Sequence, residues 1–443
     1  MRHTALLLLV AAAFMLNFGG HGMSPKRLSV DFLGLFMRPL MYPGIVWALS
    51  RAGFALGVAA GGAVWALVAL RRKTAAGAAA GAFWGAWAFV CFSLAAFTAF
   101  KLGPSRASCE KADPQPGMRL LLSRAQIDAL PGLRGALPYD AVSDPERGLL
   151  FVSLKQTRRK PGGIAAMQIP SGALLHTLVT DLPGNRPFSV NEFPERMAID
   201  TARQLVYALV LCPANNRLLV ASYENRRLAL VSLIRLAGEP NNVYADVRTG
   251  RIFVFYAAAD RYGFAVYDAQ THKKIRESAD PAFNGSAQHC VRDPRTGHLL
   301  ITNLGKNTLI ELDPESMRVV RTLDQRNPLQ GLAHDPARGL VFATAPMTRT
   351  LEIKDRSAFR ALAARRVRCG LADAAFDAPT RTVTVGGYTG AVDIFAARAP
   401  WRRAAALKTG HLLRNLHAAG NGRVYLCSGC GVFELDPRKA TSR

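Results

Sequence analysis

The chain has 443 residues, and its 56 Lys and Arg against 31 Asp and Glu give a formal net charge of +25. This length suffices for two to three domains. The basic excess would suit anionic lipids, cell-wall polymers or nucleic acid, but no nucleic-acid-binding motif is present, which disfavours nucleic acid as a partner. The seven cysteines lack the spacing of a disulfide framework or zinc site, and no cofactor motif is identified.

The first 103 residues are predicted to form a membrane region. Residues 4–18 are a short apolar segment that is either a signal peptide or a first, uncleaved helix. Residues 28–43 mix charged and aromatic side chains, which is typical of an interfacial segment. Residues 44–70 and 75–100 are each long enough to cross about 30 Å of hydrocarbon, which takes about 20 helical residues.

The two long apolar segments are predicted to form a transmembrane hairpin, because only Arg71-Arg72-Lys73-Thr74 connects them. Basic residues favour the cytoplasmic side of a membrane, so this connection is expected in the cytoplasm and the chain after residue 100 outside it. Lys26, Arg27 and Arg38 oppose this orientation. The predicted location is therefore the cytoplasmic (inner) membrane, with the bilayer as one partner and the C-terminal part extracytoplasmic.

After a linker at residues 104–117, the chain repeats a turn of the form Asp-Pro-x-x-Gly, or a close variant, followed by an apolar, β-rich run. The copies begin at Asp144, Asp246, Asp293 and Asp335, and weaker copies begin at Asp377 and Ala418. From Asp246 onward they are 47, 42, 42 and 41 residues apart. A period of about 40 to 45 residues is typical of four-stranded propeller blades. Residues 118–438 are therefore predicted to form an all-β, seven-bladed propeller, followed by a tail at 439–443.

The repeated turn of the second blade has two candidate positions. Asp200 precedes an apolar run, and so does Cys212-Pro213. Cys212 aligns with Asp293 position for position, which favours Cys212 as the start of the repeated turn in this blade.

The last repeat contains only three strands before the chain ends. Residues 118–122 are apolar and have no other evident partner. They are predicted to supply the fourth strand, which would join the two ends of the ring and remove its exposed edges.

The tetrads at residues 219–222 (Leu-Val-Ala-Ser) and 300–303 (Leu-Ile-Thr-Asn) resemble the Tyr-Val-Thr-Asn signature of the YVTN β-propeller repeat family. The resemblance extends over residues 118–438 and implies the propeller fold. Such repeats occur in lactone hydrolases, electron-transfer enzymes and binding modules, so it implies no single activity. No Trp-Asp dipeptide occurs, which disfavours the WD40 class.

Superposing the repeats predicts a site at one mouth of the central channel. Four residues before the anchor of each blade lie mostly polar residues: Asp140, Asn242, His289, Gly331, Asp373 and, in the last blade, Arg414. The polar members are predicted to bind a ligand there. Asp140, Asn242 and Asp373 could instead hold a divalent cation, or His289 could act as general base beside Asp373. The alternative is that these residues cap loop amides and line a wet channel.

Cys427 and Cys430 flank a short turn near the end of the chain. They form either a local disulfide or two unlinked thiols.

A clear architecture without a clear catalytic motif favours a non-enzymatic module. The sequence therefore predicts a membrane-anchored, extracytoplasmic propeller that binds a small molecule or protein, or acts as a scaffold. The alternative is a metal-assisted, lactonase-like hydrolase with its site at the channel mouth.

Overall fold

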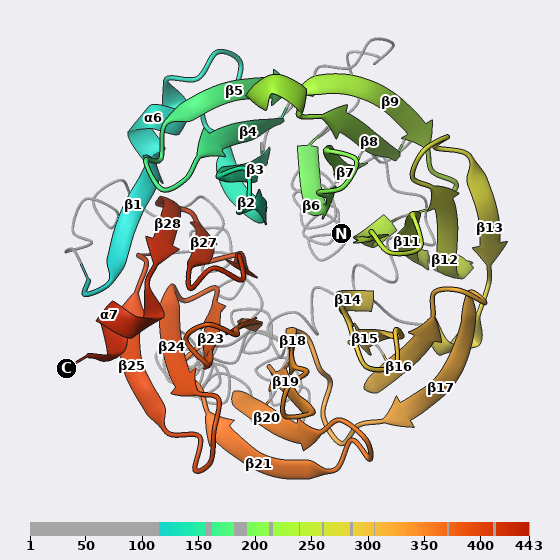
Figure 1. Cartoon of the computed structure of the whole chain (residues 1–443), viewed down its shortest axis with the longest axis vertical. Coiled ribbons are helices and arrows are strands. Elements are labelled where there is room, and N and C mark those ends of the chain that lie inside the picture. The colour runs from blue at the N-terminus through green and yellow to red at the C-terminus, as the bar shows by residue number, and fades with distance from the viewer. Residues whose placement is uncertain are drawn as a thin grey trace, which may run out of the picture.

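The computed structural model describes residues 115–155, 162–180, 193–211, 216–238, 240–258, 261–283, 287–304, 306–346, 348–369, 372–410 and 413–442. Seven four-stranded antiparallel sheets surround a central channel as the blades of a propeller (Figure 1). The predicted seven-bladed, all-β propeller is confirmed. The predicted membrane segments lie outside the described residues, and within the described ranges no helix has the length and apolar character needed to cross a bilayer.

In the first six blades the strands run in chain order from the channel to the outer rim. Blades one to three are β2 (Leu137–Asp144), β3 (Leu149–Lys155), β4 (Gly163–Gln168), β5 (Leu174–Val179); β6 (Phe193–Asp200), β7 (Leu205–Leu211), β8 (Arg217–Ser222), β9 (Ala229–Arg235); β10 (Pro240–Asp246), β11 (Arg251–Ala258), β12 (Arg261–Asp268), β13 (Lys274–Ser278).

Blades four to six follow the same order. They are β14 (Ala287–Arg292), β15 (Leu299–Asn303), β16 (Thr308–Asp313), β17 (Arg318–Asp324); β18 (Leu332–Asp335), β19 (Leu340–Ala345), β20 (Thr350–Asp355), β21 (Ala361–Arg366); β22 (Ala372–Asp377), β23 (Thr382–Gly387), β24 (Ala391–Ala396), β25 (Arg403–Lys408). The short helices are α6 (Arg124–Asp128), η2 (Glu224–Arg226), η3 (Pro281–Phe283) and α7 (Pro437–Thr441).

The seventh blade joins the two ends of the propeller. It consists of β26 (Asn415–Ala418), β27 (Val424–Ser428) and β28 (Gly431–Leu435), with β1 (Met118–Ser123) as the outermost strand. β1 pairs antiparallel with β28. Residues 118–122 therefore supply the fourth strand of this blade, as expected from the sequence. Residues 437–441, which include part of the expected tail, form α7, and Asp436 caps its first turn.

The repeated turn joins the first and second strands of each blade. Its aspartate accepts a hydrogen bond from a backbone N–H inside the turn, as Asp144 does from Arg147 (3.2 Å) and Asp293 from Arg295 (3.0 Å). Its terminal glycine has a positive φ, for example +65° at Gly148. Glycine adopts this left-handed conformation without the steric cost of a Cβ atom, which explains why the motif recurs.

The repeated turn of the second blade begins at Asp200, so the preference for Cys212 was wrong. β6 ends at Asp200, whose side chain accepts from the backbone N–H of Arg203 at 3.0 Å, as in the other turns. Gln204 occupies the glycine position and has a φ of +55°. The missing glycine concealed this turn in the sequence.

Apolar side chains pack between neighbouring blades. Phe151 of blade one contacts Tyr223 of blade two, with ring centroids 4.7 Å apart, and both side chains are buried. The surrounding cluster combines residues of both blades. Burying one such side chain contributes about 1.5–3 kcal/mol, so adjacent blades stabilise each other.

Replacing Gln204 with glycine is expected to raise the free energy of unfolding by about 1 kcal/mol. A non-glycine residue in the left-handed region costs about 1–2 kcal/mol, and the greater unfolded-state freedom of glycine offsets part of the gain. Chemical denaturation measures the change. Ala202→Gly, in the same turn but without a positive φ, is the control. Equal effects of the two substitutions would contradict the turn assignment.

Candidate functional site

One residue from each blade forms a ring around the channel, which we call the central ring. Each member lies four residues before the residue that starts the repeated turn, which in blade seven is Ala419, because its N–H bonds to the carbonyl of Arg423. The members are Asp140, Arg196, Asn242, His289, Gly331, Asp373 and Asn415. The ring therefore gathers residues that are far apart in the sequence.

The ring includes Asp140, Asn242, His289 and Asp373, which the sequence suggested as ligand-binding residues, together with Gly331; their role in binding stays a prediction. Arg196 was missed because the start of blade two was misplaced, although counting four residues back from Asp200 would have found it. Asn415 takes the place predicted for Arg414. The Arg414 guanidinium instead lies 4.5 Å from the ring centroid of Tyr388 and 5.7 Å from that of Tyr139.

The Asp140 carboxylate links three blades. Its Oδ1 accepts from the backbone N–H of Ala141 (2.8 Å) and from Asn415 Nδ2 of blade seven. Its Oδ2 accepts from the backbone N–H of Met197 in blade two (2.8 Å). Both carboxylate oxygens are therefore engaged by neighbouring donors.

Asp373 and Asn242 make equivalent links. Asp373 Oδ1 accepts from the backbone N–H of Ala374 (2.7 Å), and its Oδ2 accepts from that of Leu416 in blade seven (2.9 Å). Asn242 Nδ2 donates to the carbonyl of Gln288 in blade four (3.2 Å). The polar ring residues thus connect each of these blades to the next.

His289 reaches past blade five to blade six. Its Nε2 lies 3.1 Å from Asp373 Oδ1, although their relative orientation is not that of a hydrogen bond. Blade five contributes Gly331, where a Cβ atom would lie 2.7–2.8 Å from the backbone of Asp373 and Ala374. Glycine at this position is therefore required for the close approach of blades five and six.

Burial dominates the electrostatics of the ring. It raises the pKa of both Asp140 and Asp373 to about 6, and the neighbouring Arg196 opposes both increases. Burial also lowers the pKa of His289 well below its usual value, and the positive charge of Arg196 lowers it further. The ring thus holds a neutral imidazole and two carboxyl groups that accept protons more readily than exposed ones.

The described ranges contain no group of three or more His, Cys, Asp or Glu side chains placed to hold a metal ion. Asp140 and Asp373 direct their oxygens to backbone N–H donors, whereas a calcium-type site needs several oxygens converging at about 2.3–2.6 Å. Asp140 and Asp373 therefore belong to no such group within the described ranges, and the cation predicted for them and Asn242 stays a prediction.

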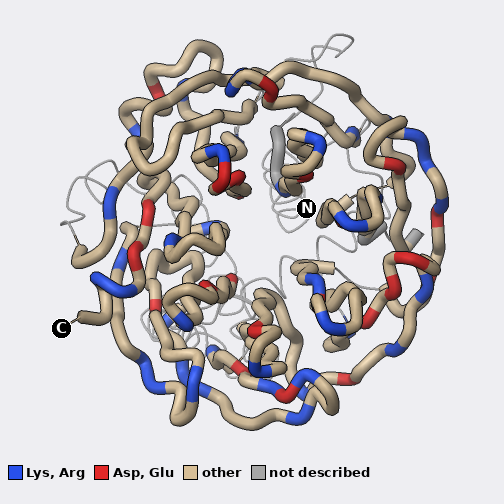
Figure 2. The backbone as a smooth tube through the Cα atoms, in the orientation of Figure 1, with Lys and Arg blue, Asp and Glu red and all other residues tan. Residues whose placement is uncertain are grey.

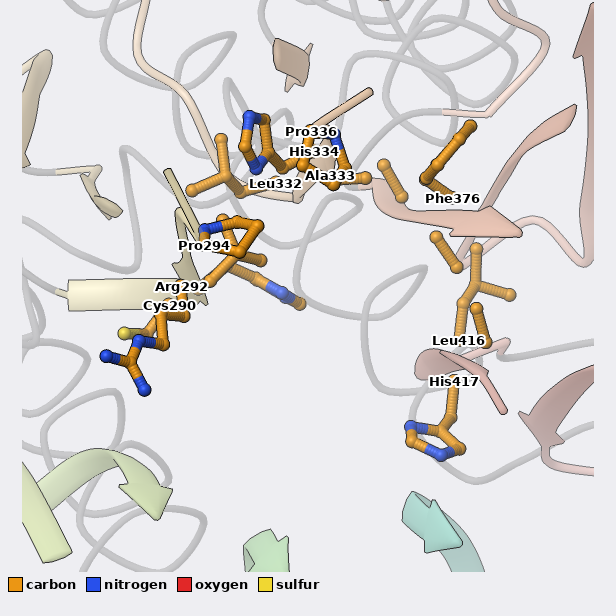
Figure 3. Close-up of a pocket in the computed structure, with 15 residues that line it drawn as sticks. Cys290, Arg292, Pro294, Leu332, Ala333, His334, Pro336, Phe376, Leu416 and His417 are labelled. Carbon is orange, nitrogen blue, oxygen red and sulfur yellow. The ribbon is translucent and has the colours of Figure 1, made fainter. Parts of the chain in front are cut away.

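A cavity of about 460 Å³ lies between the central ring and the turns that follow the inner strands (Figure 3). Arg292, His334 and His417 lie on three sides of the open space shown in Figure 3. Leu332, Phe376 and Leu416 add apolar surface. Its volume falls within the range of about 300–1,000 Å³ that is typical of small-molecule pockets.

The polar groups of the cavity are mostly uncharged at neutral pH. His417 Nε2 lies 2.8 Å from Ser143 Oγ of blade one, and burial lowers the pKa of His417 to about 4. Burial lowers the pKa of His334 and raises that of the Cys290 thiol. Arg292 is charged, but its Nη1 pairs with Asp246 Oδ1 at 2.8 Å.

The sequence left open whether Cys427 and Cys430 form a local disulfide or two unlinked thiols, and they do not form the disulfide. Cys427 is a buried free thiol, whereas Cys430 forms a disulfide bond that does not involve Cys427. Cys427 packs between blades seven and one, and Cys430 between blades six and seven.

No protein-family model matches the chain, and no curated protein matches its sequence. The resemblance to the YVTN repeat family therefore remains a prediction, and the function has to be argued from the residues of the channel.

The His417→Gln variant is expected to lose a pH dependence that the original protein shows. The neutral imidazole contributes stability that is fully present above the ordinary pKa of 6.5 and is lost as the pH falls toward about 4. This loss amounts to up to about 3 kcal/mol. Glutamine keeps a hydrogen-bonding group beside Ser143 without titrating.

Chemical denaturation of both proteins between pH 8 and pH 4 measures this difference. The stability of the original protein relative to the variant is expected to fall across that range. Parallel pH profiles would show that His417 is not held in its neutral form.

Proposed function

We propose that the propeller is a non-catalytic binding module, anchored in the cytoplasmic membrane and exposed outside the cytoplasm. The observation that carries the binding assignment is that both carboxylate oxygens of Asp140 and of Asp373 accept backbone N–H donors. These bonds give the two carboxylates a structural role, because they join blade one to blade two and blade six to blade seven. The adjacent 460 Å³ cavity instead offers space for a ligand.

The membrane part of the proposal rests on the two apolar segments, residues 44–70 and 75–100, and on the basic connection between them. A membrane hairpin would hold the binding module at the membrane surface and allow it to act as a scaffold.

A metal-assisted hydrolase of the lactonase kind is the competing function. The 3.1 Å separation of His289 Nε2 and Asp373 Oδ1 favours it, because a carboxylate beside a neutral imidazole is the arrangement of a general base and its orienting group. The same carboxylate is bound by two backbone N–H groups, and the described part of the channel offers no metal ligand cluster. The binding function is therefore the better supported of the two.

Hydrolysis assays with lactones and p-nitrophenyl esters decide between the two functions. The full chain, with and without added divalent cations, is expected to show no turnover above the uncatalysed rate, and His289→Gln is expected to change nothing. His272→Asn, in a turn outside the cavity, is the control. Turnover that disappears in His289→Gln but persists in His272→Asn would establish the hydrolase instead.

The proposed orientation predicts that an epitope placed after residue 443 is accessible from outside the cytoplasm. Protease added to spheroplasts should remove this epitope, while inverted membrane vesicles should protect it. The opposite pattern would place the propeller in the cytoplasm, and recovery of the intact chain in the supernatant after ultracentrifugation would exclude the membrane anchor.

A further inference from the structure

The two ends of the propeller are built differently, because neighbouring strands of each blade run in opposite directions. The repeated turns and, in the first six blades, the turns between the third and fourth strands lie at one end, which we call the turn face. The outer strands β9, β13, β17 and β21 follow one another along the circumference (Figure 1). Because the blades repeat around one axis, equivalent residues of these strands lie in one plane parallel to the turn face.

The large apolar side chains that are exposed in the described part of the chain all lie at the turn face. One is Val247 in a repeated turn. The others belong to the first three residues of an outer strand: Leu120, Leu174, Leu230, Val231, Ile275, Val320 and Leu362. Toward the other end of these strands the exposed side chains are polar, charged or small, as at Glu277, Thr322 and Arg366. Exposed apolar residues gathered in this way mark an interaction surface.

A β-bulge in the outer strand of every blade lies at the same place, near the start of the strand. In blades two to five the extra residue is aliphatic and 39–51% exposed, and we call these four the bulge residues: Val231, Ile275, Val320 and Leu362. A bulge interrupts the hydrogen-bond ladder and bends the strand, which disfavours the addition of a further strand. The partner of this surface is therefore one that contacts side chains.

Basic side chains accompany the bulge positions. Two residues before the extra residue stand Lys273, Arg318, Arg360 and Arg402, in blades three to six. All four are exposed, and none forms an ion pair within the described ranges, although Arg360 lies near Asp355. Figure 2 shows Lys and Arg along the outer strands. Aliphatic side chains next to cations suit the interface of a bilayer that contains anionic lipids.

The chain also enters the propeller at the turn face. β1 runs antiparallel to β28, so Met118 pairs with Leu435 at the turn face and Ser123 pairs with Gly431 at the other end. The proposed membrane hairpin ends at residue 100, which leaves residues 101–117 as the connection. At about 3.3–3.6 Å per residue, this connection spans at most about 60 Å. The turn face is therefore the end of the propeller at which the attachment to the membrane begins.

We propose that the turn face of the propeller rests on the surface of a bilayer containing anionic lipids, with the bulge residues in the headgroup region and Lys273, Arg318, Arg360 and Arg402 beside the lipid phosphates. The inference rests on the proposed membrane anchor and identifies the surface by which the propeller meets the membrane. A flat partner fits because the contacting residues lie in one plane. Pro294 and Pro336 of the repeated turns border the cavity, so the cavity lies on the membrane side of the central ring.

Photo-crosslinking to lipid tests the contact on the full chain in liposomes of phosphatidylcholine and phosphatidylglycerol. Part of the phosphatidylglycerol carries a diazirine next to its headgroup, and chymotryptic peptides are analysed by mass spectrometry after irradiation. Peptides that contain Ile275, Val320 or Leu362 are expected to be labelled several-fold more than those that contain Asn307 or Arg326, at the other end of the propeller. Equal labelling of both ends, or no labelling at the turn face, would overturn the contact and assign the exposed residues to a protein partner.

Two charge-reversal variants with the same net charge provide the matched comparison. Lys273→Glu/Arg318→Glu/Arg360→Glu is expected to reduce labelling of the turn face about tenfold, since each basic residue near an anionic surface contributes to binding. Lys306→Glu/Arg326→Glu/Arg366→Glu changes exposed bases at the other end and should leave that labelling unchanged. Equal labelling in the two variants would show that the basic residues of the turn face do not contact lipid.

The same preparation separates this inference from the membrane anchor on which it rests. Both variants keep residues 1–117 and should sediment with the liposomes. A chain that sediments with the liposomes but is not labelled at the turn face would refute the contact and leave the anchor intact. A chain that stays in the supernatant would refute both.

Discussion

Buried carboxylates on the inner strands must have their oxygens hydrogen-bonded, and in this propeller the neighbouring blade supplies the donors. Asp140 accepts from Met197, and Asp373 accepts from Leu416. The same principle operates at the turns, where Asp377 Oδ1 accepts from the backbone N–H of Gly422 at 3.1 Å. Removing one partner leaves a buried group unsatisfied at a cost of about 1–3 kcal/mol, so these bonds fix the position of each blade relative to the next.

This constraint also separates structural from functional polar groups. Asp140 and Asp373 are carboxylates of the kind that serve as general bases or metal ligands. In this propeller their oxygens bond neighbouring blades together. Arg292 and His334 border the cavity next to the ring. The cavity offers space for a ligand, and the ring forms its rigid base.

The sequence revealed the fold because the physics of one turn repeats: an aspartate that accepts from the turn backbone and a glycine with positive φ. Prediction failed where the turn departs from this chemistry. Gln204 adopts a φ of +55° without being glycine, which hid the repeated turn of blade two and with it the place of Arg196 in the ring.

In blade seven the turn is one residue shorter, since the N–H of Ala419 bonds to the carbonyl of Arg423. Counting back from Ala418 therefore reached Arg414 in place of Asn415. The cavity could not be predicted, because it depends on side-chain packing between strands of blades four to seven.

Native-state hydrogen exchange at the backbone amides of Met197 and Leu416 tests the central claim most directly. These amides donate to Asp140 and Asp373 across blade boundaries. If the carboxylates hold the blades together, both amides should exchange as slowly as the most protected amides of the central strands, through global unfolding alone. Rapid exchange, comparable with that of the exposed turns, would show that the cross-blade bonds are not maintained. The carboxylates of Asp140 and Asp373 would then be available for catalysis or metal binding, which would favour the hydrolase.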